Sequence, residues 1–215
     1  EVLVNKNYNY FVNNAKMDVV IDIGMNIGDA TLFFLNRKKT KKVYGFEPFK
    51  QTYLSAKDNL KEYINDKDRL EIFQFGISNQ NEQRNILYNQ EMSCGQSTLS
   101  TAMETARNTY KRADLISEEN DVLETIEVRK ATEILRPIIE KHVQDNLILK
   151  LDCEGDEYGI MQDLLRERLL SNFDFIMLEW HYQGKTILLN YLKEAGFSYW
   201  CNDKSEKMGL IYAYK

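Results

Sequence analysis

The feature that most constrains this chain is an apolar run ending in a glycine turn, DVVIDIGMNIGDAT at residues 18–31. The run is broken once, by Asp22, and is followed by Gly24, Asn26 and Gly28. A short apolar run bounded by glycine is typical of a strand buried on both faces, as in parallel sheets. Ligands of open α/β sheets bind at the carboxyl ends of such strands. We therefore expect the turn to hold a nucleoside-like cofactor.

Strand and helix patterns alternate along most of the chain. The alternation predicts parallel strands joined by right-handed crossovers, and hence an α/β fold. The expected strands cover 18–23, 42–47, 69–78, 146–155 and 173–181. The expected helices cover 27–37, 50–64, 131–144 (interrupted near Pro137), 158–170 and 184–196. Two further strands, 197–202 and 209–215, follow each other directly, which predicts a final antiparallel strand.

Residues 80–130 interrupt this alternation. The chain of 215 residues is expected to form a single domain, residues 1–215, with this segment inserted. Within it we expect two paired strands, 84–89 and 124–129, and a helix between them. Long connections on α/β scaffolds are often functional, so we expect a lid that recognises a polar or anionic acceptor through Ser97, Thr98, Arg107 and Lys111. The charges of this segment would equally suit a solvated helix.

Composition limits the classes of partner. The formal net charge is -5, with Lys+Arg 28 against Asp+Glu 33, which gives no overall attraction to nucleic acid or to a membrane surface. Three widely spaced cysteines form neither a disulfide framework nor a zinc motif and favour a reducing compartment. We find no 18-residue apolar stretch and no signal peptide, and expect a cytoplasmic protein without a membrane span.

Polar side chains end four of the expected strands. In a parallel sheet these ends share one edge, so the side chains should converge. Glu47 lies 25 residues after Asp22, where an acidic residue typically accepts hydrogen bonds from ribose hydroxyls. The converging residues are Asp22, Glu47, Asp152, Glu154, Glu179 and His181.

The glycine turn differs from the dinucleotide fingerprint G-x-G-x-x-G. Asn26 stands where that motif has its middle glycine, and Asp29 adds negative charge at the start of the helix. Both features disfavour a pyrophosphate at this position. They suit a ligand with a cationic or zwitterionic part.

Five strings distributed over the chain carry a family resemblance. IDIGMNIGDAT, VYGFEP, FGIS, LKLDCEGDE and LEWH together resemble the FkbM-type S-adenosylmethionine-dependent methyltransferases, from residue 18 to about residue 199. The resemblance implies a Rossmann-like methyltransferase fold: a three-layer sandwich around a mainly parallel seven-stranded sheet with a reversed C-terminal strand. It implies S-adenosylmethionine as cofactor, with the methionine end at Asp22, Gly24, Asn26 and Gly28, the ribose at Glu47, and the adenine at Gly76 and Ser78.

Methyl transfer to a hydroxyl requires the acceptor oxygen in line with the departing sulfur and is helped by a general base. The candidates for this catalysis are Asp152, Glu154, Glu179 and His181. The same cluster is also compatible with a structural polar network, or with a divalent cation bound by these groups. We assign no metal site from the sequence.

The predicted function is O-methyl transfer to a small molecule or a glycan. One alternative is a nicotinamide-dependent oxidoreductase on a similar sheet, which the absence of G-x-G-x-x-G and the terminal strand pair disfavour. Another is a catalytically inactive partner protein that still binds the cofactor. The sequence names neither the acceptor nor the oligomeric state.

Overall fold

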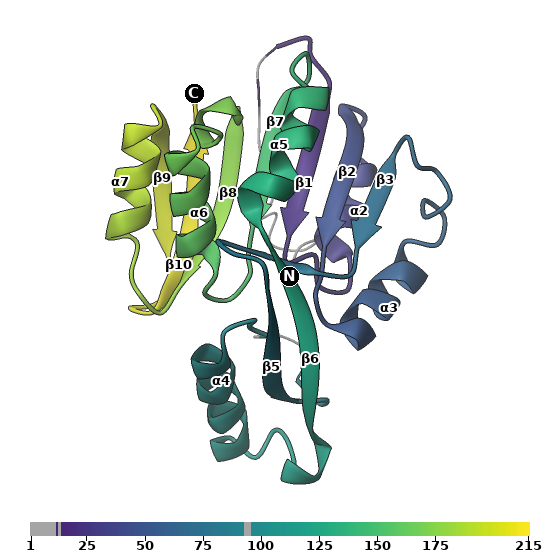
Figure 1. Ribbon diagram of the computed structural model, residues 1–215, viewed down its shortest axis with the longest axis vertical. Coiled ribbons are helices and arrows are strands. Elements are labelled where there is room, and N and C mark those ends of the chain that lie inside the picture. The colour runs from purple at the N-terminus through teal and green to yellow at the C-terminus, as the bar shows by residue number, and fades with distance from the viewer. Residues whose placement is uncertain (1–11, 13, 93–95) are drawn as a thin grey trace.

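A seven-stranded sheet forms the centre of the molecule (Figure 1). The computed structural model describes residues 12, 14–92 and 96–215. The strands lie in the order β3-β2-β1-β7-β8-β10-β9. Their bounds are β1 Asp18–Ile23, β2 Thr40–Phe46, β3 Leu70–Phe73, β7 Asn146–Leu151, β8 Phe175–His181, β9 Ser198–Asp203 and β10 Met208–Tyr214.

The strand directions confirm the predicted α/β fold. β1 pairs in parallel with both β2 and β7, β2 with β3, and β7 with β8. β10 is antiparallel to both β8 and β9, so it is the reversed strand. The chain moves outward from β1 to β3 and later returns to β7 on the other side of β1. The boundary between β1 and β7 is therefore the switch point at which open α/β sheets bind ligands.

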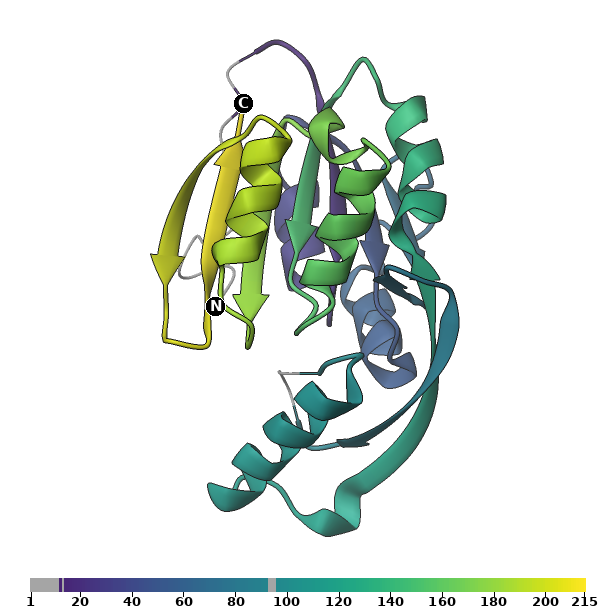
Figure 2. The same cartoon turned by 60° about the vertical axis from the view of Figure 1, so that its left-hand side comes forward.

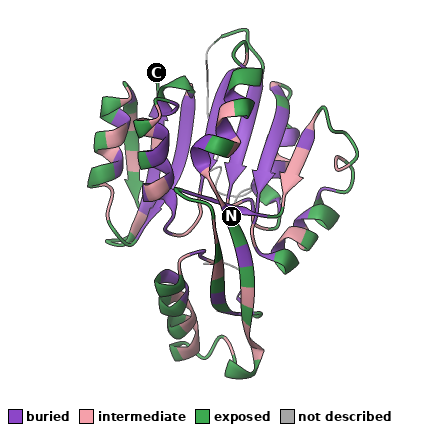
Figure 3. Ribbon diagram, viewed as in Figure 1, coloured by how far each residue is buried: buried purple, intermediate pink, exposed green. Residues whose placement is uncertain are grey.

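Helices cover both faces of the sheet, and its central strands β1, β7 and β8 are buried along their whole length (Figure 3). Successive side chains of a strand point to opposite faces, so each strand contributes to two cores. Val19 and Ile21 belong to a core cluster that includes residues of α5, α6 and α7, and Val20 belongs to a second cluster that includes residues of α2 and α3. No helix in the described part of the chain is long and apolar enough to cross a membrane. The helix bounds are α2 Asp29–Leu35, α3 Lys50–Asn59, α5 Ala131–Lys141, α6 Glu157–Arg166 and α7 Thr186–Glu194, with a 3-10 turn at Leu170–Asn172.

The prediction of one strand over 69–78 is wrong. β3 ends at Phe73, its last pairing with β2, and the chain bends at the exposed Gln74. The following strand, β4 (Gly76–Ser78), joins a second sheet by pairing with β6. An alternating apolar pattern does not reveal this change of partner, because apolar residues continue through both halves.

Two helix predictions also need correction. The helix expected over 50–64 ends at Asn59, and the residues beyond it form turns. The helix expected to be interrupted near Pro137 is continuous from Ala131 to Lys141. Pro137 lies on the exposed side of α5, as does Glu133 one turn earlier, so water can solvate the carbonyl that loses its donor.

The segment predicted as an insertion forms an arm built from three elements and a 3-10 turn. They are β5 (Glu82–Asn89), α4 (Ser100–Arg112), the turn Glu118–Asn120, and β6 (Asp121–Lys130). β5 and β6 are antiparallel, as predicted, and form a sheet in the order β4-β6-β5. Figures 1 and 2 show the arm beyond the carboxyl ends of the parallel strands. Its own small core consists of Phe49, Ile86, Tyr88, Met92, Met103, Ile126 and Val128.

A buried polar network attaches the arm to the loop after β7. Arg84 of β5 donates from Nη1 to Asp156 Oδ2 at 2.6 Å and from Nη2 to Ser78 Oγ at 2.8 Å. The Ser78 hydroxyl donates to Asp156 Oδ1 at 2.7 Å, and the Thr98 hydroxyl also donates to Asp156. One carboxylate therefore holds four segments of the chain together.

Replacing Arg84 by Met should lower the free energy of unfolding by about 3 kcal/mol, because the buried Asp156 carboxylate would lose its cation. Urea unfolding of both proteins measures the difference. Arg136→Met is the matched control, since Arg136 pairs at 3.6 Å with Glu167 and both are exposed. The control should lose less than about 1 kcal/mol. Equal losses in the two variants would contradict a special role for the network.

Candidate active site

The turn after β1 has a backbone conformation that few side chains tolerate. Gly24, Asn26 and Gly28 have φ angles of 76°, 52° and 88°. Glycine adopts this left-handed region freely, and asparagine adopts it more readily than most residues. Gly24 and Asn26 remain partly exposed at the edge of the sheet. The turn is thus accessible from the side where the parallel strands end.

Glu47 lies directly after β2, and its carboxylate accepts hydrogen bonds from the backbone of this turn and of the residues that follow β2. Its Oε2 accepts a hydrogen bond from the Asn26 amide at 3.0 Å, and its Oε1 accepts one from the Phe49 amide at 3.0 Å. Burial raises the pKa of Glu47 to about 7, although the two amide bonds lower it in part. Each carboxylate oxygen has two lone pairs, so both can accept a further donor, such as a ribose hydroxyl.

A buried ammonium group ties the turn to the end of β7. Lys150 Nζ donates to the Gly24 carbonyl at 2.6 Å and lies 3.0 Å from Asp22 Oδ1 and 3.8 Å from Asp152 Oδ2. The other oxygen of Asp22 accepts a hydrogen bond from the Thr31 hydroxyl at 2.7 Å. Burial lowers the pKa of Lys150, but the charges of Asp22 and Asp152 raise it more, so the ammonium stays charged. Asp22 is fully buried and serves as the counterion of Lys150.

The same two segments touch directly through their backbones. A Cβ atom on Gly24 would lie 1.8 Å from the Asp152 carbonyl oxygen, so no side chain fits there. This contact places the first residue after β7 beside the glycine turn. The structure thus brings the two halves of the predicted site together across the switch point between β1 and β7.

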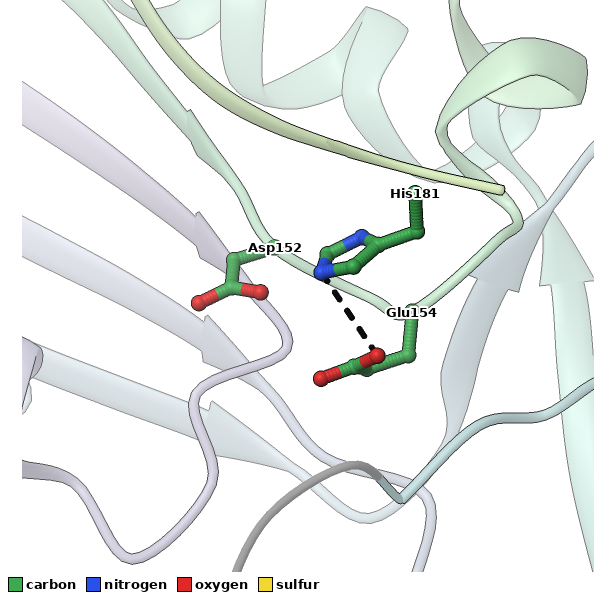
Figure 4. Close-up of side chains that lie close together, drawn as sticks. All are labelled: Asp152, Glu154 and His181. Atoms are coloured by element: carbon green, nitrogen blue, oxygen red, sulfur yellow. Dashed lines mark ion pairs between the residues drawn. The ribbon is translucent and has the colours of Figure 1, made fainter. Parts of the chain in front are cut away.

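Three side chains gather beyond that contact (Figure 4). Asp152 and Glu154 come from the loop after β7, and His181 is the last residue of β8. His181 Nε2 lies 3.5 Å from Glu154 Oε2. One ligand atom from each residue lies within 4.8 Å of the other two. Glu154 itself has a positive φ of 57°, a conformation uncommon for a side chain of its size.

Glu157 orients the imidazole from the opposite side. Its Oε1 lies 2.9 Å from His181 Nδ1, and its Oε2 accepts a hydrogen bond from the Gly155 amide at 2.7 Å. Since a carboxylate only accepts, Nδ1 carries the hydrogen of this pair. The Nε2 atom is left facing Asp152 and Glu154.

Two groups of the cluster, Glu154 and His181, have raised pKa values. Burial raises the pKa of Glu154 to about 7, with the charge of His181 opposing the shift. Burial lowers the pKa of His181, but the hydrogen bond to Glu157 and the charge of Glu154 raise it more, to about 9. The residues can therefore exchange a proton or balance a positive charge under ordinary conditions.

Two other side chains lie beside the cluster with different properties. Glu179 Oε1 is 4.0 Å from His181 Nε2 but only 2.9 Å from Lys204 Nζ, so its charge is largely balanced. Burial and the nearby carboxylates raise the pKa of Cys153 well above its ordinary value, which excludes a ready thiolate nucleophile. Cys94 lies outside the described residues.

The two residues expected near an adenine, Gly76 and Ser78, are the first and last residues of β4. Ser78 is fully buried and its hydroxyl belongs to the Asp156 network. A Cβ on Gly76 would meet Val128 at 3.0 Å and Pro48 at 3.4 Å, so Gly76 allows close packing of β4. The structure therefore gives both residues contacts that attach β4 to its surroundings.

The four residues expected to contact an acceptor separate into two pairs. Ser97 and Thr98 are buried, and the Ser97 hydroxyl donates to the Glu154 carbonyl at 2.6 Å. They hold the loop before α4 against the cluster. Arg107 and Lys111 instead donate to Asp121 Oδ2 at 2.5 and 2.7 Å. The structure places these two charges within the arm and not at the cluster.

Several residues of the site were not singled out from the sequence. Asp156 and Glu157 belong to the string KLDCEGDE, whose density of charge is a visible signal, but their separate roles depend on side-chain direction. Lys150, from the same string, was considered only as part of a structural polar network. Arg84 has no sequence signal, because nothing local links β5 to a carboxylate 72 residues away.

Comparison with known proteins identifies the domain type. The chain matches the sequence profile of the Methyltransferase FkbM domain over residues 22–199. No curated protein matches it significantly. A solved structure of methyltransferase FkbM from Methylobacillus flagellatus KT is similar, with a TM-score of 0.58 and 15% identity, over 97% of this chain and 47% of that one. The chain spans about half the length of that protein.

Two further solved structures are less similar to the chain. An rRNA methylase from Streptococcus thermophilus has a TM-score of 0.49 and 13% identity, over 93% of this chain and 87% of that one. A Streptococcus mutans protein solved in complex with SAH has a TM-score of 0.47 and 14% identity, over 92% of this chain and 88% of that one.

Replacing Gly24 by Ala should lower the free energy of unfolding by about 2–5 kcal/mol, from backbone strain plus the clash with Asp152. Gly184→Ala is the matched control, because Gly184 has nearly the same φ, 75°, and nothing within 4 Å of its Cβ position. The control should lose only the strain, about 1–2 kcal/mol. Denaturant unfolding of both variants tests the contact, and an equal loss would argue against it.

Proposed function

The chain belongs to the FkbM methyltransferase family, and on this basis we propose that it transfers a methyl group from S-adenosylmethionine to a hydroxyl oxygen of a small molecule or glycan. One observation carries the proposal. The glycine turn with Glu47 and the cluster of Asp152, Glu154 and His181 meet at one sheet edge, joined by the backbone contact of Gly24 with Asp152.

The residues around the turn fit the cofactor. Glu47 offers two oxygens with free lone pairs to the ribose hydroxyls. Gly24, Asn26 and Gly28 shape an accessible turn without bulky side chains, and Asp22 supports it through Lys150. We assign the methionine end to this turn, where the surrounding carboxylates suit its ammonium group.

The proposed role of Asp152, Glu154 and His181 follows from the charges that change during methyl transfer. S-adenosylmethionine supplies an electrophilic methyl group on a positively charged sulfur. As the bond from methyl to acceptor oxygen forms, the bond to sulfur breaks, and the hydroxyl must give up its proton. Asp152, Glu154 and His181 face the place where that proton is lost, and Glu157 keeps the imidazole in position. Glu179 contributes negative charge from the rim.

A neutral, polar acceptor agrees with the composition and with the arm. The net charge of -5 would repel a polyanion, and Arg107 and Lys111 are occupied by Asp121. Ser97 and Thr98 bring the arm close to Glu154 and Asp156. We infer that the arm covers the acceptor, as a lid on an otherwise single-domain protein.

Binding of S-adenosylhomocysteine and of NAD to the purified chain separates the proposal from an oxidoreductase. Calorimetry should detect S-adenosylhomocysteine and not NAD, and the reverse result would overturn the proposal. Incubation with labelled S-adenosylmethionine and separate panels of glycans, small alcohols and RNA then tests the acceptor. Transfer to RNA alone would overturn the acceptor class. Absence of transfer to any panel, despite cofactor binding, would favour an inactive partner protein.

Glu47→Gln should weaken S-adenosylhomocysteine binding by about 1–3 kcal/mol and change its pH dependence. In the unchanged protein the carboxyl is protonated below its pKa of about 7 and accepts hydrogen bonds poorly. Affinity should therefore fall as the pH drops below about 7 and level off above it. Titrations between pH 5.5 and 8.5, on the order of three units about that pKa, measure this difference.

Glu154→Gln is the control for this experiment. Glu154 has a similar pKa of about 7 but belongs to the acceptor half. Its replacement should leave the acid-side fall in affinity in place, whereas Glu47→Gln should remove it. If both variants keep the full pH dependence, the ribose role of Glu47 is wrong.

A further inference from the structure

We propose that Asp152, Glu154 and His181 bind one divalent cation of the Mn²⁺ type at the end of β7 and β8. The inference deepens the proposed function and rests on it for its chemical purpose. Nothing in the family assignment requires a metal. The site is supported by its geometry, by one unpartnered nitrogen and by the choice of donor atoms.

The geometry needs only a small adjustment. One ligand atom from each of the three residues lies within 4.8 Å of the other two. Bonds of about 2.0–2.2 Å from a metal to nitrogen and oxygen allow ligand atoms to be at most about 4.2–4.4 Å apart. The carboxylate side chains are about one-quarter exposed, 25% for Asp152 and 22% for Glu154, and a rotation of each toward the ion would close this difference.

The unpartnered nitrogen is His181 Nε2. The side chain of His181 is only 3% exposed, yet Nε2 makes no hydrogen bond to any described residue. Its nearest carboxylate oxygen, Glu154 Oε2, is 3.5 Å away, too far for a good hydrogen bond. A buried polar atom without a partner costs about 1–3 kcal/mol, so such an atom is rarely left bare in a folded protein. A cation between the three residues, taking the place of the proton on Nε2, supplies the missing partner.

The support of the imidazole is typical of metal ligands. A ligating histidine usually donates its other ring N–H to a carboxylate, which fixes the ring and strengthens the bond to the metal. Glu157 does this at 2.9 Å from Nδ1 and is itself held by the Gly155 amide. Glu157 is fully buried and contacts the imidazole at Nδ1, the nitrogen opposite the proposed ligand atom, so we assign it to positioning the ligand.

The surrounding charges favour a cation at this place. Four carboxylates lie at or beside the cluster: Asp152, Glu154, Glu157 and Glu179. Lys150 is shared between Asp22 and Asp152, and Lys204 pairs with Glu179. Each of these two ammonium groups is therefore paired with a carboxylate other than Glu154.

The donor set selects the kind of cation. Two carboxylates and one imidazole suit first-row divalent metals, whereas Mg²⁺ and Ca²⁺ prefer oxygen ligands alone. The neighbouring thiol of Cys153 donates instead to Glu157 at 3.6 Å, which disfavours a site for a thiolate-preferring metal. Three protein ligands leave further positions for water and for the oxygen of an acceptor.

Such a cation would acidify the acceptor hydroxyl. A hydroxyl bound to a divalent metal loses its proton at a much lower pH than a free one. Its proton passes to solvent, the oxygen forms its bond to the methyl carbon, and the methyl–sulfur bond breaks to leave neutral S-adenosylhomocysteine. The atoms and charges balance without any other reactant.

Electron paramagnetic resonance of Mn²⁺ titrated into the purified, metal-depleted chain tests the inference. We expect one bound ion per chain and a nitrogen coupling from one imidazole. Asp152→Asn and Glu154→Gln should each weaken Mn²⁺ binding more than about tenfold. Glu62→Gln, which removes an exposed carboxylate after α3, is the matched control and should bind as the unchanged protein does.

The outcomes are distinct from those of the proposed function. Absence of Mn²⁺ binding, absence of the nitrogen coupling, or equal binding by all four proteins would overturn the site. The nitrogen coupling is measured on the unchanged chain, so the test holds even where a variant unfolds. S-adenosylhomocysteine binding is measured on the same sample without metal. Cofactor binding without Mn²⁺ would defeat only the metal site, and Mn²⁺ binding without cofactor would defeat only the methyltransferase proposal.

Discussion

The buried ammonium of Lys150 is the interaction on which the site depends. A charge enclosed in a sheet is unstable unless its partners are close, and here they come from two adjacent strands. Lys150 on β7 reaches Asp22 on β1 and the carbonyl of Gly24. These contacts hold the ends of both strands level, so that Gly24 packs against the Asp152 backbone. The proposed positions of the cofactor and of the acceptor both depend on this alignment of β1 with β7.

The site consists of two halves with different chemistry. On the β1–β2 side, backbone amides and the buried Glu47 give a turn suited to a polar nucleoside with an amino-acid end. On the β7–β8 side, carboxylates surround an imidazole whose orientation is set by Glu157. The ion pair between Arg84 and Asp156 attaches the arm to the loop that follows β7.

Local patterns predicted the sheet well because each strand is a short apolar run ended by a turn. The predictions failed where the pattern stayed the same but the partner changed. Leu70–Phe73 and Gly76–Ser78 read as one strand and belong to two sheets. Pro137 read as a break, yet α5 continues because its exposed side can leave one carbonyl to water. Neither outcome is encoded within a few neighbouring residues.

The sequence by itself determined the α/β layout, the glycine turn and the polar ends of β1, β2, β7 and β8, because these depend on periodicity and on residue type. Only the tertiary structure decided what each charge faces. Arg107 and Lys111 bind Asp121 within the arm, and Ser78 is part of the Asp156 network. His181 meets Glu154 and Glu157 because β8 packs beside β7. Electrostatic partners distant in the chain are set by packing, which one-dimensional spacing does not contain.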